Sequence, residues 1–319
     1  MSGAGHRPEI TACAPSRIRT LSPMAVPTIL FPADPLAPRR PDPHFAREAR
    51  RLAELGGEYA LVDHDALLAG EATTAVRRVP VGLGPLWYRG WMVPGAAYAR
   101  FAAALDARGA TLLTSPAGYT SAHELPGWYG VFEGATPASS WIPLDRPGLV
   151  PDPQALAAAA ARLGGSGPAI VKDYVKSRKH EWAEACFVPE LGDLPALERV
   201  VARFVELQED SLAGGVVLRR FEDFAGAREG RAAEARVWWL DGEPVVVGPH
   251  PDSPGLTPDP DLGGVRPLVR ALGCRFVTTD LALGADSGDW RVVEVGDGQV
   301  SDLATGLDPT ALLGPLLAA

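Results

Sequence analysis

The stretch FVTTDLALGADSGDWRVVEVGDGQ, residues 276–299, decides how the second half of the chain folds. Residues 276–283 and 290–295 are rich in β-branched and apolar side chains, and a loop of Gly, Ala, Asp and Ser separates them. Such a pair of runs predicts a β-hairpin. The hairpin would place side chains of its two strands next to each other.

Three carboxylates stand on this hairpin. Asp280 lies in the middle of the first strand, Glu294 near the end of the second, and Asp297 in the turn that follows. A carboxylate on an otherwise apolar strand is costly to bury unless a cation compensates it. Paired strands can hold Asp280 and Glu294 side by side, where a hard, oxygen-seeking ion such as Mg²⁺ would relieve their repulsion. The alternative is that one or both point to solvent or pair with Arg236 or Arg291.

The lysines of the chain are few and clustered. Of 30 Lys and Arg residues only Lys172, Lys176 and Lys179 are lysines, and all lie in the run VKDYVKSRK. Arg replaces Lys readily on a solvated surface, but less readily where a compact ammonium must reach a phosphate. The cluster, which follows an apolar strand at 169–172, therefore predicts that at least one lysine is functional. Chance clustering on an exposed segment is the alternative, and Lys179 is expected on a solvated face.

Two further strands carry cations and a carboxylate. The run VVLRRF contains Arg219 and Arg220, of which only one is expected to face the site, because side chains alternate along a strand. Glu234 and Arg236 open another strand, and the turn at 241–242, Asp-Gly, predicts a hairpin after it. Long cations and carboxylates on separate strands suit a site for a metal–nucleotide complex.

The first half of the chain alternates short apolar strands with amphipathic helices. This order predicts a small α/β layer with a mainly parallel sheet. Arg89, in the run WYRGW, is a candidate contact for an acidic substrate. Strands are expected at 28–31, 59–62, 86–88 and 110–113, helices at 44–55 and 96–107, and a linker or crossing loop at 126–151.

The predicted fold class is thus α/β and α+β, with antiparallel hairpins confined to the second half. The chain is expected to divide into a disordered tail at 1–23, an N-terminal α/β domain at 24–150 and a second domain at 151–319. Residues 1–23 lack the apolar stretch of a secretory signal. Further helices are expected at 153–163, 194–207 and 262–272.

Composition limits the function classes. The 319 residues are 46% hydrophobic and 22% charged, as in globular proteins, and no run reaches the ~18 apolar residues of a membrane span. A net charge of −9 argues against nonspecific binding to nucleic acid or anionic membranes. The three cysteines lack the spacing of a disulfide framework or zinc site, which favours the cytoplasm. The signatures of a dinucleotide-binding loop, a P-loop and a hydrolase elbow are absent.

Residues 168–299 resemble an ATP-grasp domain. PAIVKDYVKS resembles the strand and loop with the phosphate-binding lysine, and GGVVLRRFEDF the strand that leads to the adenine-contacting hinge. EARVWWLDGEPV resembles the acidic-x-Arg strand of that family, and the stretch 276–299 its two metal-bearing strands. The motifs VKDYVKS and EVGDGQ are most similar to those of one ATP-grasp clade, which occurs in bacteria and phages and is named for its arginine and lysine signature. The first half is compatible with the small preceding domain of such enzymes, and the second half with their two-subdomain fold.

The resemblance implies an ATP-dependent carboxylate–amine ligase that forms an acyl phosphate and releases ADP and phosphate. ATP and Mg²⁺ are the implied cofactors, and the implied substrates are small molecules, amino acids or peptides, with no nucleic acid or membrane partner. The sequence makes no prediction of oligomeric state. The implied site comprises catalytic Arg236, Lys176 and Arg220, nucleotide-binding Lys172, Lys176, Arg219, Phe221, Glu222 and Glu234, and metal-binding Asp280, Glu294 and Asp297.

One departure leaves alternatives open. The family usually ends its metal site in Glu-x-Asn, but this chain has no Asn and carries Gly296 at that place. Asp297, Gln299 or water would then supply the third oxygen. A nucleotide-binding module without catalysis, and a kinase that stops at phosphoryl transfer to a hydroxyl, are the alternatives to a ligase.

Overall fold

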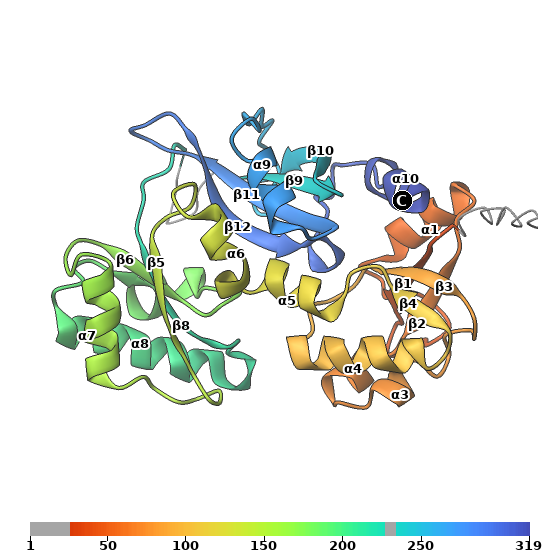
Figure 1. Ribbon diagram of the computed structural model, residues 1–319, viewed down its shortest axis with the longest axis horizontal. Helices are drawn as coiled ribbons and strands as arrows, with labels where there is room; N and C mark the ends of the chain where they lie inside the picture. The colour runs from red at the N-terminus through yellow and green to blue at the C-terminus, as the bar shows by residue number, and fades with distance from the viewer. Residues whose placement is uncertain (1–25, 227–233) are drawn as a thin grey trace, which may run out of the picture.

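The computed structural model describes residues 26–226 and 234–319, which form three four-stranded sheets with helices packed around them (Figure 1). The tail predicted at 1–23 lies outside the described residues. Within the described ranges, no helix combines the length and apolarity needed to cross a bilayer.

The first sheet is entirely parallel and confirms the α/β prediction for the first half. Its strand order is β2-β1-β3-β4. The helix α4 buries Tyr98, Phe101 and Leu105 on one face, the 3.6-residue spacing that the sequence shows. The elements are β1 (Thr28–Pro32), α1 (Ala46–Glu54), β2 (Tyr59–Val62), α2 (His64–Leu68), α3 (Ala72–Ala75), β3 (Gly84–Tyr88), α4 (Gly95–Asp106) and β4 (Ala110–Leu112).

The second sheet is antiparallel, with the order β5-β8-β6-β7 and the helices α7 and α8 packed against it, at the left of Figure 1. Strand β5 lies in the stretch 126–151, so the linker expected there is wrong for these residues. The division at residue 150 remains a proposal, and the pairing of β5 with β8 favours a division before β5. The elements are β5 (Ser139–Pro143), α7 (Pro153–Arg162), β6 (Ala169–Lys172), β7 (Phe187–Val188), α8 (Leu194–Gln208) and β8 (Gly215–Arg220).

The third sheet, in the order β10-β9-β11-β12, consists of the two predicted hairpins joined side by side. Asp241 and Gly242 both have positive φ, 49° and 81°, as the tight two-residue turn requires. The helix α9 begins four residues later than expected. The elements are β9 (Glu234–Leu240), β10 (Glu243–Pro249), α9 (Arg266–Leu272), β11 (Phe276–Leu283), β12 (Trp290–Asp297) and α10 (Thr310–Ala318).

Alternation along β9 explains how one face of the third sheet serves two purposes. Residues 234, 236, 238 and 240 share a face. Glu234 and Arg236 are polar, whereas Trp238 and Leu240 join an apolar cluster with β1, α1 and α10. The polar end of this face remains available for a site, and the apolar end packs the sheet against β1, α1 and α10.

Arg89 strengthens this junction rather than a substrate site. Its guanidinium is fully buried, pairs with both carboxylate oxygens of Glu48 at 2.9 and 2.6 Å, and donates to the backbone carbonyls of Gly298, Gln299 and Ser301. The expected contact of Arg89 with an acidic substrate is therefore wrong. A buried guanidinium with these bonds holds the segment after β12 against the first domain.

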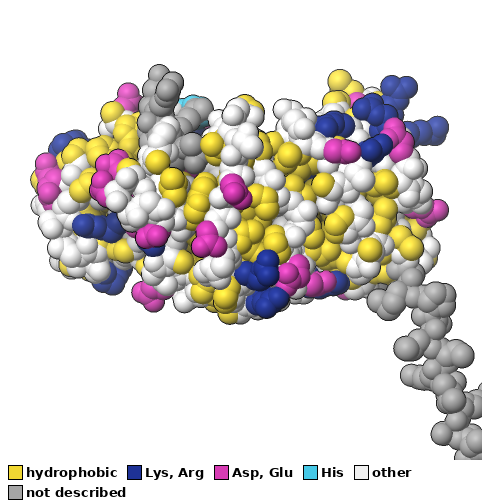
Figure 2. Space-filling view, turned by 90° about the horizontal axis from the view of Figure 1, so that it is seen from above, with side chains coloured by type: hydrophobic (Ala, Val, Ile, Leu, Met, Phe, Trp, Pro, Cys, Tyr) yellow, Lys and Arg dark blue, Asp and Glu magenta, His cyan; other side chains and the backbone are white. Residues whose placement is uncertain are grey.

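Two helices join the halves at the centre of the molecule. α5 (Pro116–His123) and α6 (Leu125–Phe132) lie between the parallel sheet and the two antiparallel sheets (Figure 1). On the face in Figure 2, basic side chains occur in small groups with acidic ones close by, and hydrophobic side chains are scattered.

Candidate active site

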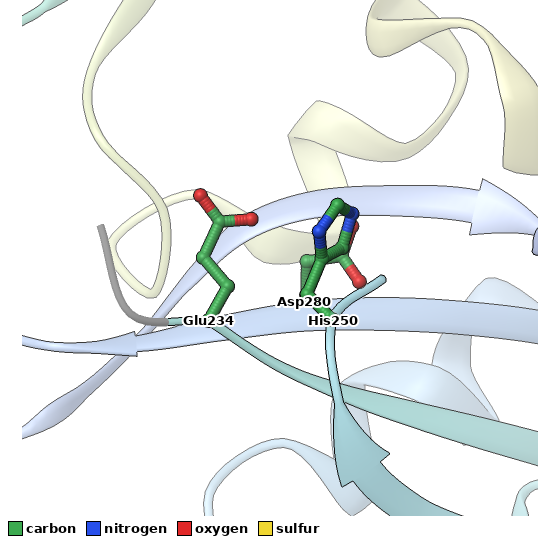
Figure 3. Close-up of side chains that lie close together, drawn as sticks. All are labelled: Glu234, His250 and Asp280. Carbon is green, nitrogen blue, oxygen red and sulfur yellow. The ribbon is translucent and has the colours of Figure 1, made fainter. Parts of the chain in front are cut away.

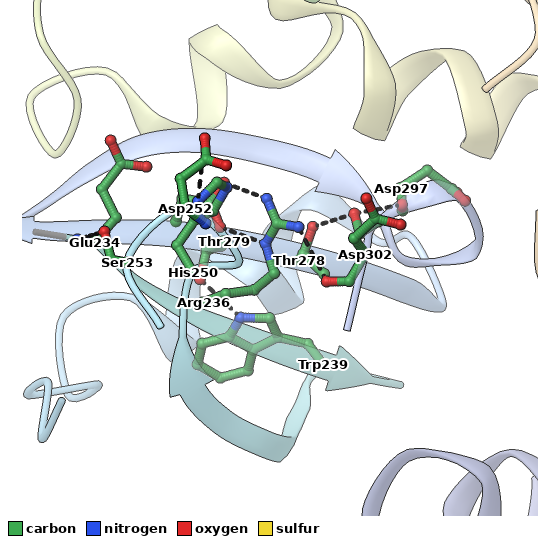
Figure 4. Close-up of polar contacts among 12 residues, drawn as sticks. Glu234, Arg236, Trp239, His250, Asp252, Ser253, Thr278, Thr279, Asp297 and Asp302 are labelled. Carbon is green, nitrogen blue, oxygen red and sulfur yellow. Dashed lines mark hydrogen bonds and ion pairs between the residues drawn. The ribbon is translucent and has the colours of Figure 1, made fainter. Parts of the chain in front are cut away.

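The centre of the site is an ion pair between neighbouring strands. In the sheet register, Asp280 of β11 stands opposite Arg236 of β9 on one side and Glu294 of β12 on the other. Arg236 donates from Nε and Nη2 to the two Asp280 oxygens, each at 2.8 Å (Figure 4). Burial opposes ionisation of Asp280, but Arg236 outweighs it and holds the pKa of Asp280 below its ordinary value. Asp280 and Glu294 are adjacent, as the sequence predicted. The ion pair between Asp280 and Arg236 agrees with the alternative, in which a carboxylate of the hairpin pairs with an arginine.

Glu234 and His250 lie beside Asp280 (Figure 3), and one ligand atom from each of the three residues falls within 4.8 Å of the others. The backbone N–H of Asp252 donates to His250 Nδ1 at 3.1 Å. Because Nδ1 accepts, the ring proton sits on Nε2, which lies 3.7 Å from Asp280 Oδ2. This tautomer makes His250 a donor toward Asp280, so the oxygens of Glu234 and Asp280 are the better cation ligands.

Lysines at the end of β6 and on the segment that follows it lie near these carboxylates. Lys172, the last residue of β6, is 4% exposed and donates to the Val175 carbonyl at 3.3 Å, and burial lowers its pKa. Lys179 Nζ lies 3.5 Å from Glu234 Oε1. Burial alone would lower the pKa of Lys179, but Glu234 and its acidic neighbours raise it. Lys179 keeps 37% of its side chain exposed, as expected for a solvated position, but its ammonium group lies toward Glu234, which the sequence did not predict. Lys176 is exposed on the loop after β6.

A cavity of about 250 Å³ opens in front of the ion pair. It receives residues from the first domain, from α5, from the loop after β6 and from the third sheet. Acidic side chains outnumber basic ones, and Arg236 is the one Lys or Arg that contributes among the described residues. The lining residues are Met92, His123, Val175, Arg236, His250, Pro251, Asp252, Thr278, Asp280, Glu294, Gly296, Val300, Ser301 and Asp302.

The two arginines of β8 separate as alternation predicts. Arg219 is 3% exposed and donates to Ser139, Thr136 and the carbonyl of Val293, which ties β8 to β5 and β12. Burial lowers the pKa of Arg219 to about 10. Arg220 points to the opposite face and donates to the carbonyls of Leu163 and Ser166. This position corrects the expected catalytic role of Arg220, and Arg219 serves the framework in this structure rather than the cavity.

The predicted hinge residues follow β8 where the chain passes from the second sheet to the third. Phe221 packs edge-on against Trp182 and Phe187, at ring-centroid distances of 6.0 and 5.3 Å. Glu222 accepts from Nε and Nη2 of Arg291, each at 2.9 Å. The segment therefore has an aromatic cluster on one side and a fixed carboxylate on the other, and its nucleotide contacts stay a prediction.

Asp297 does not join Asp280 and Glu294. It stands three residues after Glu294 on β12 and so faces the opposite side of the strand. It is fully buried, and its Oδ1 accepts from the backbone and side-chain N–H groups of Gln299. The fully buried Gln299 is bonded in turn to Tyr98 and to the Tyr88 N–H. Neither Asp297 nor Gln299 lines the cavity, which corrects the assignment of Asp297 to the metal site.

Asp297→Asn is expected to stabilise the protein at pH 8. Burial raises the pKa of Asp297 to about 7, so the folded state holds a proton that the unfolded chain releases near pH ~4. The stabilising effect of that proton is complete below pH ~4 and is lost as the pH rises through the folded value. Thermal denaturation should show a gain of up to about 4 kcal/mol at pH 8 and a smaller one at pH 5. Loss of Mg²⁺-dependent ATP turnover in this variant would instead restore Asp297 as a metal ligand.

Sequence reasoning missed several cavity residues. His123 and His250 stand alone in the sequence without a metal-binding spacing. Asp302 lies three residues after the stretch 276–299, and its Oδ1 is 2.8 Å from His44 Nε2. Thr278 precedes Asp280 by two residues, which places it on the same face of β11. This alternation of side chains along a strand was the one sequence feature that could have indicated Thr278 as a cavity residue.

Comparison with known proteins agrees with this architecture. Residues 162–316 match the model of an ATP-grasp domain family, the third family of the clade named for its arginine and lysine signature. No curated protein matches the sequence.

The fold is similar to solved structures at low sequence identity. One is a RimK domain protein ATP-grasp from Sphaerobacter thermophilus, with 15% identity, a TM-score of 0.57, and coverage of 92% of this chain and 100% of that chain. A second is the ATP-grasp ligase PsnB in complex with a minimal precursor, Mg and ADP, with 15% identity, a TM-score of 0.54, and coverage of 94% and 99%. A third is D-alanyl-alanine synthetase A from Vibrio cholerae, with 12% identity, a TM-score of 0.52, and coverage of 92% and 99%. Residues 162–316 thus match an ATP-grasp domain of the arginine-and-lysine clade, and the fold of the chain is similar to those of ATP-grasp proteins.

Proposed function

We propose that the protein is an ATP-dependent carboxylate–amine ligase. ATP phosphorylates a substrate carboxylate, and an amine then displaces phosphate from the acyl phosphate, so the products are an amide, ADP and phosphate. The observation that carries this proposal is the pairing of opposite charges between two parts of the fold: Lys179, on the segment after β6, lies 3.5 Å from Glu234 of the third sheet, and Glu294 of that sheet acts to raise the pKa of the buried Lys172. Such an arrangement suits the transfer of a phosphoryl group, where charge must be held on both sides.

The phosphate-binding roles follow from position. Lys172 would hold the α- and β-phosphates, and its burial strengthens interactions with anions. Lys176 and Lys179 continue the row of cations toward the transferred phosphate. Arg236 lines the cavity and would neutralise charge on the phosphoryl group. Phe221 and Glu222 would meet adenine and ribose at the hinge.

The donor set fits Mg²⁺. Asp280 and Glu294 are adjacent across two strands, and Glu234 offers a further carboxylate oxygen near Asp280. Each carboxylate oxygen has two lone pairs, so Asp280 can accept from Arg236 and still bind a cation. Mg²⁺ held there would supply charge neutralisation to the phosphate oxygens.

The neighbours in fold support an amide-forming reaction. One is described as a ligase with a precursor peptide, Mg and ADP, and another as a synthetase of D-alanyl-alanine. On this basis we propose an amino acid or peptide as substrate. Cys186 and Cys274 are both buried and free, which suits the proposed cytoplasmic location.

Turnover is expected to yield ADP and phosphate, and only when a carboxylate and an amine are both present. The cations of the site, together with Mg²⁺ held by its carboxylates, would stabilise charge on a transferring γ-phosphoryl group, not on the α-phosphate. Chromatography of the spent nucleotide, with a panel of amino acids and short peptides, measures this directly. Predominant AMP would contradict the acyl-phosphate route. ADP with a phosphorylated hydroxyl would identify a kinase, and tight binding of ATP without turnover a nucleotide-binding module.

A further inference from the structure

His123 is the last residue of α5, the helix at the centre of the molecule (Figure 1), and it lines the same cavity as Arg236, Asp280 and Glu294. Its ring stacks on Tyr119 with 5.0 Å between centroids and 28° between planes. Tyr119 is itself fixed, because its hydroxyl donates to the Val93 carbonyl at 2.8 Å. The orientation of the imidazole is therefore set before any substrate binds.

The hydrogen-bonding capacity of His123 is unused. Among the described residues, neither ring nitrogen has a hydrogen-bond or ion-pair partner, although the cavity around it is rich in polar groups. Burial is the main cause that lowers the pKa of His123 to about 4. Glu294 acts to raise this pKa, whereas Lys176 and Lys172 act to lower it. The ring is consequently neutral at physiological pH in the absence of nucleotide, with one N–H donor and one lone pair to offer. The negative charge of bound phosphates would raise its pKa toward the range of an effective base.

Other groups in the cavity are less suited to accept a proton, and Glu294, which also lines it, is a proposed ligand of Mg²⁺. Asp280 is paired with Arg236, and Asp302 with His44. His250 directs its Nε2 proton toward Asp280. Asp252 keeps 66% of its side chain exposed, where water competes for it. An amine that attacks a carbonyl carbon must lose a proton, and a neutral imidazole is the side chain most often used for this transfer.

We propose that His123 is a catalytic residue that accepts the proton of the attacking amine. This inference rests on the proposed ligase function. The amine lone pair forms the C–N bond at the acyl-phosphate carbon, the C–O bond to phosphate breaks, and phosphate leaves with the electron pair. The surplus N–H proton passes to the free ring nitrogen of His123 and later to solvent.

Two variants separate this role from packing. His123→Phe keeps an aromatic ring on Tyr119 without nitrogen, and His123→Gln keeps polarity without a basic site. His64→Gln is the matched control, since His64 lies in the first domain and lines a different cavity. Three reactions are measured with a carboxylate that supports turnover in the wild type. They are amide formation with an amino acid, hydroxamate formation with hydroxylamine, and oxygen-isotope scrambling in ATP with the carboxylate alone.

Both His123 variants are expected to lose amide formation by about 10²- to 10⁴-fold. Isotope scrambling, which reports acyl-phosphate formation, should stay within about threefold of wild type. Hydroxylamine should restore product formation, because it is a weaker base than an amino acid and its adduct loses the surplus proton readily to water. Amide formation at wild-type rates, or an equal loss of all three reactions, would overturn the assignment of His123. Absence of isotope scrambling in the wild type with every carboxylate tested would overturn the ligase function itself.

Discussion

Asp280→Ala is expected to abolish Mg²⁺-dependent ATP turnover and to lower the free energy of unfolding by about 3–5 kcal/mol. The variant removes a proposed metal ligand and also leaves Arg236 without its bidentate partner. Arg236 and Asp280 have side-chain exposures of only 13% and 6%, so water cannot fully replace the lost pair. Denaturant unfolding, together with ADP release at limiting Mg²⁺, measures the two effects separately.

Glu294→Gln is the comparison for this variant. Within residues 26–226 and 234–319, no salt bridge engages Glu294, so its loss should abolish turnover with much less effect on stability. The stability gap between wild type and Asp280→Ala should also shrink in acid. The pKa of Asp280 is held below its ordinary value, so the contribution of the pair is present above pH ~4 and is lost as the pH falls through the folded value. Wild-type turnover in either variant at limiting Mg²⁺ would exclude that residue as a ligand.

Lys172→Met is expected to weaken ATP binding by about 1.5–3 kcal/mol, or roughly 10- to 150-fold, without loss of stability. The ammonium group is buried and makes one hydrogen bond, of 3.3 Å, to a backbone carbonyl of the described residues. In the absence of nucleotide it is therefore poorly compensated, and an apolar side chain of similar length should be tolerated or preferred. Calorimetric titration with Mg·ATP measures the affinity, and thermal denaturation measures the stability.

Arg220→Met supplies the matched cation control. Arg220 precedes the hinge but points away from the cavity, toward the carbonyls of Leu163 and Ser166. Its replacement should leave ATP affinity within about twofold of wild type, because surface substitutions outside a site change little. Equal affinities of wild type and Lys172→Met would contradict the phosphate-binding role. A large loss in Arg220→Met would restore the catalytic role that the sequence suggested.

Local sequence patterns were sufficient to predict the first and third sheets and the central charged residues of the site. Alternating apolar residues and the Asp241-Gly242 turn predict the third sheet, whose register then places Asp280 beside Glu294 and Arg236. Clustering of lysines after a buried strand predicts Lys172 at a cleft. These features depend on neighbours in sequence or on one hairpin, and the period of a strand fixes which side chains share a face.

The remaining positions depend on how distant elements pack. Lys179 reaches Glu234 because the loop after β6 folds toward the third sheet, and alternation along β12 turns Asp297 away from the cavity and into the junction with the first domain. β5 joins the second sheet from within a stretch that reads as a linker, because strand pairing there is made with residues more than 70 positions away. His123 enters the cavity only because α5 crosses between the domains.

The sequence by itself determined the strands of the first and third sheets, their faces and the chemical character of the site, since these follow from short-range periodicity. Tertiary structure alone decided which isolated charges and rings meet. The free energy of such contacts depends on burial and distance, which one strand or helix does not define.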